Sequence, residues 1–342
     1  MKTEIDGRRG EHMDALRQAL LSMRRATRAQ LAEATGLSAM TVGKLLAVMQ
    51  ERGEVFQGDT QRLAGGRPSV IAQYNGDYLH FATVVVEQRE GKSAFTLSIY
   101  NLFGEPVLSE ELLLADVRVD SFDPFFEQAA AQGYRLALSV FVLPGVADGE
   151  RIVLCDLEAL VGDPFLPRLK ERFGMEVLFE NDVNGAVLGH AFHAEDQAVC
   201  AGIYFPKKYC PGAGIVIDSK VLHGNQCFAG EFGYVQGEEN WMALDYADKK
   251  SVIGMVGQSL VIYACTIAPR SMVLYGDFFT PEIEQGLLRY LRERLKGRFD
   301  MEITCRTSMA ADMERGAVRL GLERMHAMLK QADKTEKGIA SI

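Results

Sequence analysis

The sequence predicts a mixed α/β protein in which a helical amino-terminal unit precedes an α/β body with a recurring pattern. Its 342 residues exceed what one compact domain usually contains, so two or three domains are expected. Amphipathic helix patterns run to about Arg52 and a hairpin pattern follows, and from about Asp77 the chain changes to apolar runs of strand length. In the body, a meander of strands followed by alternating helix and strand occurs twice.

The composition and charge distribution fit a soluble globular protein with one basic end. Hydrophobic residues make up 48% of the chain and charged residues 24%, which excludes neither an enzyme nor a regulator. The net charge is -9, yet residues 1–75 hold 11 Lys and Arg against 8 Asp and Glu, and the rest hold 26 against 38. A basic end is able to face nucleic acid, whereas an acidic body is repelled by it.

The six cysteines lie far apart, with no C-x-x-C pair and no His at metal-ligand spacing, so we expect reduced thiols in a cytoplasmic protein. The amino terminus lacks the apolar core of a signal peptide. The most membrane-like stretch, Val252–Ala268, is short, contains Gln258 and Ser259 and runs into Pro269, so a buried helix is expected. The cysteines are Cys155, Cys200, Cys210, Cys227, Cys265 and Cys305.

Helix signals follow one another along the amino-terminal unit. MDALRQALLSMRR places three leucines on one helical face. Thr27 and Gln30 have the spacing of a capping box, so a second helix is expected from about Arg28 to Gly36. The three leucines are Leu16, Leu20 and Leu21.

A third helix and a hairpin complete this unit. Ser38 is a good N-cap for a helix that is expected to run to about Arg52 and to stop at Gly53. Beyond it, EVFQ and RPSVIAQY flank GDTQRLAGG, a pattern that predicts a β-hairpin. The inward positions of the third helix are Val42, Leu45, Leu46 and Met49.

A short helix, a tight turn containing Gly and a third helix form the helix-turn-helix arrangement, whose third helix enters the major groove of DNA. The hairpin would be its wing. Gly43 offers no side chain, so base contacts are expected to be sparse, and wing contacts and DNA shape carry more of the specificity. A small helical domain for protein contacts is the alternative. The expected DNA contacts are Arg28, Ser38, Ala39, Thr41 and Lys44, with Arg62 and Arg67 near the wing tip and phosphate contacts from Arg24, Arg25, Arg28 and Lys44.

A family resemblance strengthens the DNA-binding interpretation. TRAQLAEATGLSAMTVGKLLAVMQERGEV resembles winged helix-turn-helix regulators, and GGRP, Gly65–Pro68, resembles the wing of the ROK family, named for repressors, open reading frames and sugar kinases. In that family the helix-turn-helix reads DNA and a sugar-kinase-like body senses a ligand. The resemblance therefore implies a double-stranded DNA operator as a partner.

The body pattern is similar to the duplicated ribonuclease-H-like fold of actin, hexokinase and ROK proteins. FATVVVEQ, SAFTLSIYN and EPVLSEELLL predict one meander, followed by LALSVFVLP and MEVLFE. AVCAGIYF, GAGIVIDS and KVLHG predict the second, followed by helices and the strands RSMVLYGD and MEITCR. The resemblance implies a cleft between the halves. The expected domains are residues 1–75, 76–190 and 191–342, the last closing with a helix from about Met309 to Leu329.

ENDVN, Glu180–Asn184, follows a predicted strand and opens a predicted helix. In the ROK signature that it resembles, the Asn-Asp pair holds sugar hydroxyls and the Asp is the base of phosphoryl transfer. The resemblance therefore implies a ligand-binding role for Asn181 and Asp182. The residues alone allow a plainer interpretation, in which Asn181 or Asp182 caps the following helix, and both interpretations are compatible.

FAGEFGYV, Phe228–Val235, resembles the second sugar-contact stretch of the family, with Glu231 in the carboxylate position. Tyr234 stands where the family has a histidine that contacts sugar and binds zinc together with a following C-x-C-G-x-x-G-C run. Here that run reads QGEENWMALDYADKK, and tyrosine is a poor zinc ligand at neutral pH. We therefore expect no metal and no other cofactor.

The stretches that correspond to phosphate loops depart further from the family. ROK kinases carry a D-x-G-G-T turn after the first strand, where VVVEQREGKSAF brings Glu87 and Glu90, whose charges would repel a nucleotide. PKKYCPGAGIVI keeps Gly212 and Gly214 but places Pro211 ahead of them, and a later double glycine is reduced to YGD. The sequence predicts that phosphoryl transfer is absent and that no catalytic set remains.

These observations predict a DNA-binding transcriptional regulator, a repressor of carbohydrate-related genes, that acts as a homodimer or a dimer of dimers without a membrane partner. The resemblance implies a sugar or sugar-derived effector between the halves, whose binding alters their closure and the helix-turn-helix spacing. Two alternatives remain open. One is an active sugar kinase carrying a helix-turn-helix, and the other is a structural oligomer without an effector.

Overall fold

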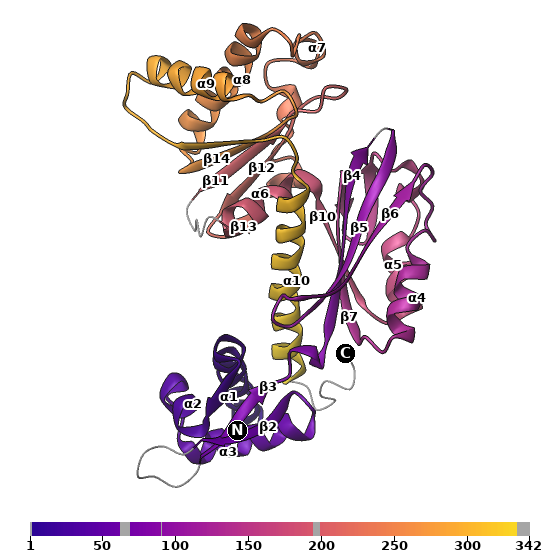
Figure 1. Ribbon diagram of the computed structural model, residues 1–342, viewed down its shortest axis with the longest axis vertical. Helices are drawn as coiled ribbons and strands as arrows, with labels where there is room; N and C mark the ends of the chain where they lie inside the picture. Colours follow the sequence, from indigo (N-terminus) through magenta and orange to yellow (C-terminus); the bar gives the residue numbers. More distant parts are fainter. Residues whose placement is uncertain (1, 62–68, 90, 194–198, 334–342) are drawn as a thin grey trace.

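The computed structural model describes residues 2–61, 69–89, 91–193 and 199–333. Three helices, a short strand and a hairpin make up the amino-terminal unit at the bottom of Figure 1. Its sheet has the antiparallel order β1-β3-β2. The elements are α1 (Lys2–Met23), β1 (Arg25–Thr27), α2 (Arg28–Thr35), α3 (Ala39–Glu51), β2 (Val55–Gln61) and β3 (Ser69–Tyr74).

Capping geometry confirms the predicted helix boundaries of this unit. Thr27 and Gln30 form the reciprocal capping box at the start of α2, and Gly36 ends that helix with a φ of 69°. The Ser38 side chain accepts a hydrogen bond from the Thr41 amide at 3.1 Å and caps α3. The four predicted inward residues of α3 are buried. Strand β1 is too short to show a period-2 pattern, so sequence reasoning did not predict it.

The body contains two five-stranded sheets with the same strand order. In the first sheet a three-stranded antiparallel meander is extended by two parallel strands, in the order β6-β5-β4-β7-β10. The second sheet repeats this arrangement as β13-β12-β11-β14-β15, so the predicted repetition is confirmed. The strands are β4 (His80–Arg89), β5 (Lys92–Asn101), β6 (Pro106–Leu114), β7 (Leu136–Leu143), β10 (Glu176–Asn181), β11 (Cys200–Tyr204), β12 (Gly212–Ile217), β13 (Lys220–Val221), β14 (Ser271–Tyr275) and β15 (Glu302–Arg306).

Helices cover both sheets. Edge-to-face rings of Phe122, Phe141 and Phe165 join β7 to the helices on the first sheet, with centroids 5.2 to 5.5 Å from the Phe141 ring. Figure 1 shows α8 and α9 over the second sheet. The remaining elements are α4 (Asp123–Ala131), the hairpin β8 (Gly145–Asp148) and β9 (Arg151–Cys155), α5 (Phe165–Phe173), α6 (Asp182–His193), α7 (Glu238–Met242), α8 (Lys249–Thr266), α9 (Pro281–Arg294), α10 (Ala310–Ala332), and the 3-10 helices η1 (Gly76–Tyr78), η2 (Glu158–Leu160), η3 (Asn225–Cys227) and η4 (Phe232–Tyr234).

Helices α6 and α10 touch backbone to backbone at glycines. A Cβ at Gly189 would overlap the carbonyl oxygen of Asp312, and a Cβ at Gly316 would overlap that of Gly185. Only residues without a side chain allow helices to approach so closely. As a result α6, which begins at Asp182, is held firmly against α10.

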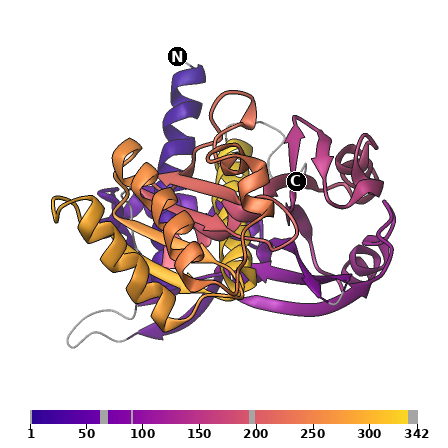
Figure 2. The ribbon, with the colours of Figure 1, turned by 90° about the horizontal axis from the view of Figure 1, so that it is seen from above.

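Helix α10 links the three parts of the molecule, because it runs from the second sheet past the first sheet to the amino-terminal unit (Figure 1). At its start the buried Asp312 accepts a hydrogen bond from the Tyr275 hydroxyl at 2.9 Å and pairs with Arg306 at 3.0 Å. Its apolar side belongs to one core that is continuous from Leu16 of α1 through Met325 of α10. Figure 2 shows the two α/β units lying side by side.

Within the described ranges, no single helix is both long enough and apolar enough to cross a bilayer, and only the bent pair of α2 and α3 meets that length and composition test. The predicted apolar helix after the second meander is α8. Its residues Val252, Val256 and Leu260 are fully buried against the second sheet, as expected for a core helix.

Candidate DNA interface and ligand site

The outer face of α3 carries short side chains and few free polar groups. Ala39 and Lys44 are exposed as predicted, whereas Thr41 is half-buried. Ser38 is exposed, but its hydroxyl caps the helix and lies 2.9 Å from the Thr41 hydroxyl. Met40 is 73% exposed, and sequence reasoning missed it because apolar helix residues are expected in a core.

Arg28, the first residue of α2, lies against this face of α3. A side chain at Gly43 would place its Cβ only 3.1 Å from the Arg28 Cζ. Arg28 and Lys44 are exposed, and neither forms an ion pair with a carboxylate in the described part of the chain. Arg62 and Arg67, expected near the wing tip, lie outside the described residues.

Arg24 lies at the junction with the body. Its guanidinium donates a hydrogen bond to Glu105 at 2.6 Å and sits 4.6 Å from the ring centroid of Phe103. Both partners belong to the turn between β5 and β6. Arg24 is thus engaged with the body in this structure, and its phosphate contact stays a prediction.

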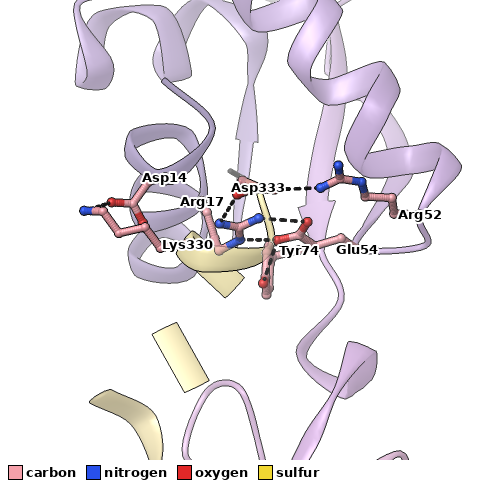
Figure 3. A network of polar contacts seen from close by, with 7 residues as sticks. All are labelled: Asp14, Arg17, Arg52, Glu54, Tyr74, Lys330 and Asp333. Atoms are coloured by element: carbon pink, nitrogen blue, oxygen red, sulfur yellow. Dashed lines mark hydrogen bonds and ion pairs between the residues drawn. The ribbon is translucent and has the colours of Figure 1, made fainter. Parts of the chain in front are cut away.

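A buried network of charges joins the amino-terminal unit to the end of α10 (Figure 3). Arg17 of α1 pairs with both carboxylate oxygens of Glu54 and donates to Asp333 at 2.8 Å. Arg52 donates to the other oxygen of Asp333 at 2.7 Å, and the Tyr74 hydroxyl donates to Glu54 at 3.1 Å. Sequence reasoning missed this joint because its partners are as far as 316 residues apart.

The energetics of the joint follow from its burial. The side chains of Arg17 and Glu54 are fully buried, and that of Asp333 is 2% exposed. Burial alone would lower the pKa of the Arg17 guanidinium, but the two carboxylates outweigh that effect and raise it. Removal of the Glu54 charge would leave the buried Arg17 cation poorly compensated, which is strongly destabilising, whereas removal of the Asp333 charge leaves Arg17 paired with Glu54. The joint therefore fixes the amino-terminal unit against α10.

Asn181 caps α6, the helix that packs against α10 near the end of α10 opposite Asp333. Its Oδ1 accepts from the amides of Val183 at 3.0 Å and Asn184 at 3.2 Å, and its Nδ2 donates to the Gly145 carbonyl at 3.2 Å. The capping interpretation of Asn181 is therefore confirmed. Because both of its polar atoms are engaged, a ligand would have to share or displace these hydrogen bonds.

Asp182 is a buried carboxylate without a cation partner among the described residues. It is 8% exposed, and its Oδ1 accepts from the Val183 amide at 2.9 Å. Burial, assisted by the nearby negative charge of Asp156, raises the pKa of Asp182 to about 7. A carboxyl group with such a pKa exchanges a proton near neutral pH, and it is able both to donate to and to accept from a ligand hydroxyl.

Glu180 and His223 bridge the two α/β units beside Asp182. Glu180, at the end of β10, accepts from Asn184 Nδ2 at 3.0 Å and lies 2.9 Å from His223 Nε2, which follows β13. This hydrogen bond with Glu180 raises the pKa of the His223 imidazole. Sequence reasoning missed the pair, although Glu180 directly precedes Asn181, because KVLHG showed only a strand pattern.

Glu231 does not join this cluster directly. Its carboxylate is exposed and makes no hydrogen bond to Asn181 or Asp182. The preceding Gly230 carbonyl accepts from an amide of β12 at 2.8 Å, which ties this stretch to the second sheet. Tyr234, at the position of the family's histidine, is 64% exposed and stacks on Phe228 with centroids 5.7 Å apart.

The stretch that corresponds to the first phosphate loop is a tight hairpin. Pairing of β4 with β5 continues up to Arg89 and Lys92. Glu87 pairs with Arg89 at 3.0 Å and accepts a hydrogen bond from the Ser308 hydroxyl, so its carboxylate is present where the sequence predicts it. Glu90 lies outside the described residues.

The glycines of the second loop pack against α6. A Cβ at Gly214 would lie 3.1 Å from both the Val183 carbonyl oxygen and Asn184 Oδ1, and a Cβ at Gly212 would lie 3.5 Å from a Val183 methyl group. Gly214 therefore makes room for the helix that starts at Asp182, whereas a Cβ at Gly212 would make only ordinary contact. Two hollows open elsewhere on the surface, one lined by Phe126, Tyr134 and Arg135 and the other by polar and apolar residues in and around α7 and the first part of α8.

The repeated sheet order and the position of Asp182 at the start of α6 define a sugar-kinase-like α/β body. Residues 116–257 match the model of the ROK family. Among curated relatives it is 24% identical over 232 residues to the xylose repressor of Caldicellulosiruptor bescii, covering 64% of this chain and 56% of the relative. It is 23% identical over 223 residues to the DNA-binding transcriptional dual regulator NagC of Escherichia coli, covering 62% and 54%. The chain thus spans little more than half the length of these relatives.

Solved structures show the same fold. A ROK family transcriptional regulator, a homolog of the E. coli MLC protein, aligns with a TM-score of 0.63 at 16% identity, covering 94% of this chain and 99% of that one. The ROK hexokinase of Thermus thermophilus aligns with a TM-score of 0.58 at 17% identity, covering 72% of this chain and all of that one.

Proposed function

We propose that this chain is a DNA-binding transcriptional regulator, a repressor of sugar-related genes, whose kinase-like body has lost phosphoryl transfer. Residues 1–75 form the winged helix-turn-helix domain, and residues 76–190 and 191–342 form the two halves of the body. The relatives named as xylose repressor and NagC support this assignment. By the same similarity the effector is a sugar or a sugar derivative, and the working form is a homodimer or a dimer of dimers.

The observation that carries the proposal is the geometry of α2 and α3. The two helices bend by 110° about a turn that contains Gly36, within the range of helix-turn-helix units. One face of α3 is buried, and its other face is exposed beside cations that lack carboxylate partners in the described residues. Such a face suits the major groove, where phosphates surround the base edges.

Three features support the loss of phosphoryl transfer. Glu87 places negative charge near the first would-be phosphate loop, and the strands there pair up to the turn. Gly214 is packed tightly against α6, so its place is set by the fold. Catalysis of phosphoryl transfer depends on positioning and neutralising the phosphates, which these stretches do not favour.

The structure also suggests how an effector signal would reach DNA. A ligand at Asp182 would act on the first turn of α6, which packs against α10 at glycines. The far end of α10 carries Asp333, which holds Arg17 and Arg52 of the amino-terminal unit. An effector that prefers one closure of the two halves would then shift the orientation of the DNA-reading helices, as linkage requires.

Selection of DNA from a random-sequence duplex pool tests the main proposal. We expect enrichment of a pseudo-palindromic motif, and the absence of any enriched sequence would count against DNA recognition. The kinase alternative retains one favourable feature, the pKa of Asp182 near 7, which suits a general base. Titration calorimetry with Mg-ATP is expected to give no binding heat, and a clear saturable heat would revive that alternative.

A further inference from the structure

The guanidinium of Arg28 lies flat on the backbone of α3 at Gly43. A Cβ on Gly43 would be 3.1 Å from the Arg28 Cζ and 3.3 Å from both Nε and Nη1. A point directly above the centre of a planar guanidinium is nearly equidistant from these atoms. The face of the guanidinium therefore covers Gly43, and its N–H groups point outward around the rim, where they remain able to donate.

The residues of α3 on either side of Gly43 leave the Arg28 guanidinium uncovered. Ala39 and Ala47, one turn to either side of Gly43, are exposed and small, so they do not cover the guanidinium. Met40 flanks the same face and is 73% exposed. The Arg28 guanidinium, which belongs to α2, thus lies where a side chain at position 43 of α3 would otherwise lie.

Fold stability does not explain this position. Arg28 is the first residue of α2, where the helix dipole disfavours a cation. In the described part of the chain its side chain makes no ion pair and no hydrogen bond, whereas Arg24 is paired with Glu105. An exposed guanidinium that lies over α3 without a carboxylate partner in the described residues is suited to an external acceptor.

We propose that Arg28, supported by Gly43, reads a guanine in the major groove of each operator half-site. This inference rests on the proposed DNA-binding function. An arginine fork donates two parallel hydrogen bonds to O6 and N7 of guanine, which is the commonest specific base contact. Gly43 favours this arrangement, because a side chain there would press on the guanidinium and shift it from its place over α3.

The test uses the full chain and the duplex motif that the wild type selects from a random-sequence pool. Arg28→Ala should lose the preference for guanine at one position in each half-site and bind the motif about 10–100-fold more weakly. Equal weakening on all sequences, with the salt slope reduced by about one, would make Arg28 a phosphate contact and overturn the inference. If the wild type selects no motif, the proposed function itself fails.

Gly43→Ala provides an independent test, because its effects on folding and on binding have opposite signs. Alanine is the better helix former, so thermal stability should rise, while affinity for the selected motif should fall several-fold. In an Arg28→Ala background the same change should leave affinity unaltered, and additive losses would contradict the inference. Gly254→Ala is the matched control, since Gly254 lies in α8 with open space around it, and it should leave DNA binding unchanged.

Discussion

Two buried carboxylates near opposite ends of α10 differ in what surrounds them. Glu54 is completely buried, and it is paired with Arg17 and hydrogen-bonded by Tyr74. Asp182 is 8% exposed and has no cation partner in the described residues, and burial raises its pKa to about 7. The first arrangement satisfies a charge so that it holds two units together. The second leaves the Asp182 carboxyl group without a cation in the described residues, as expected of a site that binds a ligand from solvent.

Removal of the paired carboxylate should have the largest effect on stability. Glu54→Gln leaves Arg17 buried with only Asp333 for compensation, and we expect a loss of roughly 3–5 kcal/mol in the free energy of unfolding. Urea unfolding, with hydrogen exchange of the α1 amides, would measure it. The control is Glu105→Gln, which removes the exposed partner of Arg24 and should change little. Equal losses of stability in Glu54→Gln and Glu105→Gln would contradict the role assigned to the buried pair.

Neutralisation of Asp182 should raise the free energy of unfolding, whereas Glu54→Gln should lower it. The pKa of Asp182 is raised on folding, so its contribution is stabilising below about pH 4 and is lost as the pH rises through 7. Asp182→Asn should therefore be more stable than the wild type at pH 8, by roughly 2–4 kcal/mol, and nearly equal to it at pH 4. Thermal unfolding at pH 4, 6 and 8 checks this, and a difference independent of pH would refute it.

A smaller effect is expected at the end of α10. Asp333→Asn keeps acceptor oxygen for Arg17 or Arg52 but loses the charge, so stability should fall by about 1–2 kcal/mol. The matched control is Asp14→Asn, which removes the partner of the half-exposed Lys330 on the same helix pair. In the proposed mechanism only Asp333→Asn weakens the effect of a bound sugar on DNA affinity. Equal loss of effector response in both variants would argue against this path.

The smallest effect on stability should come from the exposed cations. Lys44→Ala removes a charge without a carboxylate partner in the described residues, so thermal unfolding should be unchanged. Its affinity for the selected duplex should fall on all sequences alike, with the salt slope reduced by about one. Anisotropy titrations at several salt concentrations measure this, and an unaltered slope would place Lys44 away from the phosphates.

The sequence predicted the features that depend on neighbouring residues. The capping box of Thr27 and Gln30 and the apolar runs of the meander strands are local patterns, and both are confirmed. The sequence missed contacts between distant segments, such as the pairing of Arg17 with Asp333 and the bridge from Glu180 to His223. The local sequence pattern does not indicate which cation a carboxylate pairs with after folding. Contacts such as Arg17 with Asp333 and Glu180 with His223 were therefore not predicted.

The central claim is that the amino-terminal unit reads DNA as part of a symmetric assembly. A hydroxyl-radical footprint on the selected duplex tests it most directly. We expect two equivalent protected patches whose centres lie about 34 Å or a multiple of it apart, related by the symmetry of the motif. Protection that is uniform along any duplex, or confined to one side of the motif, would contradict the claim.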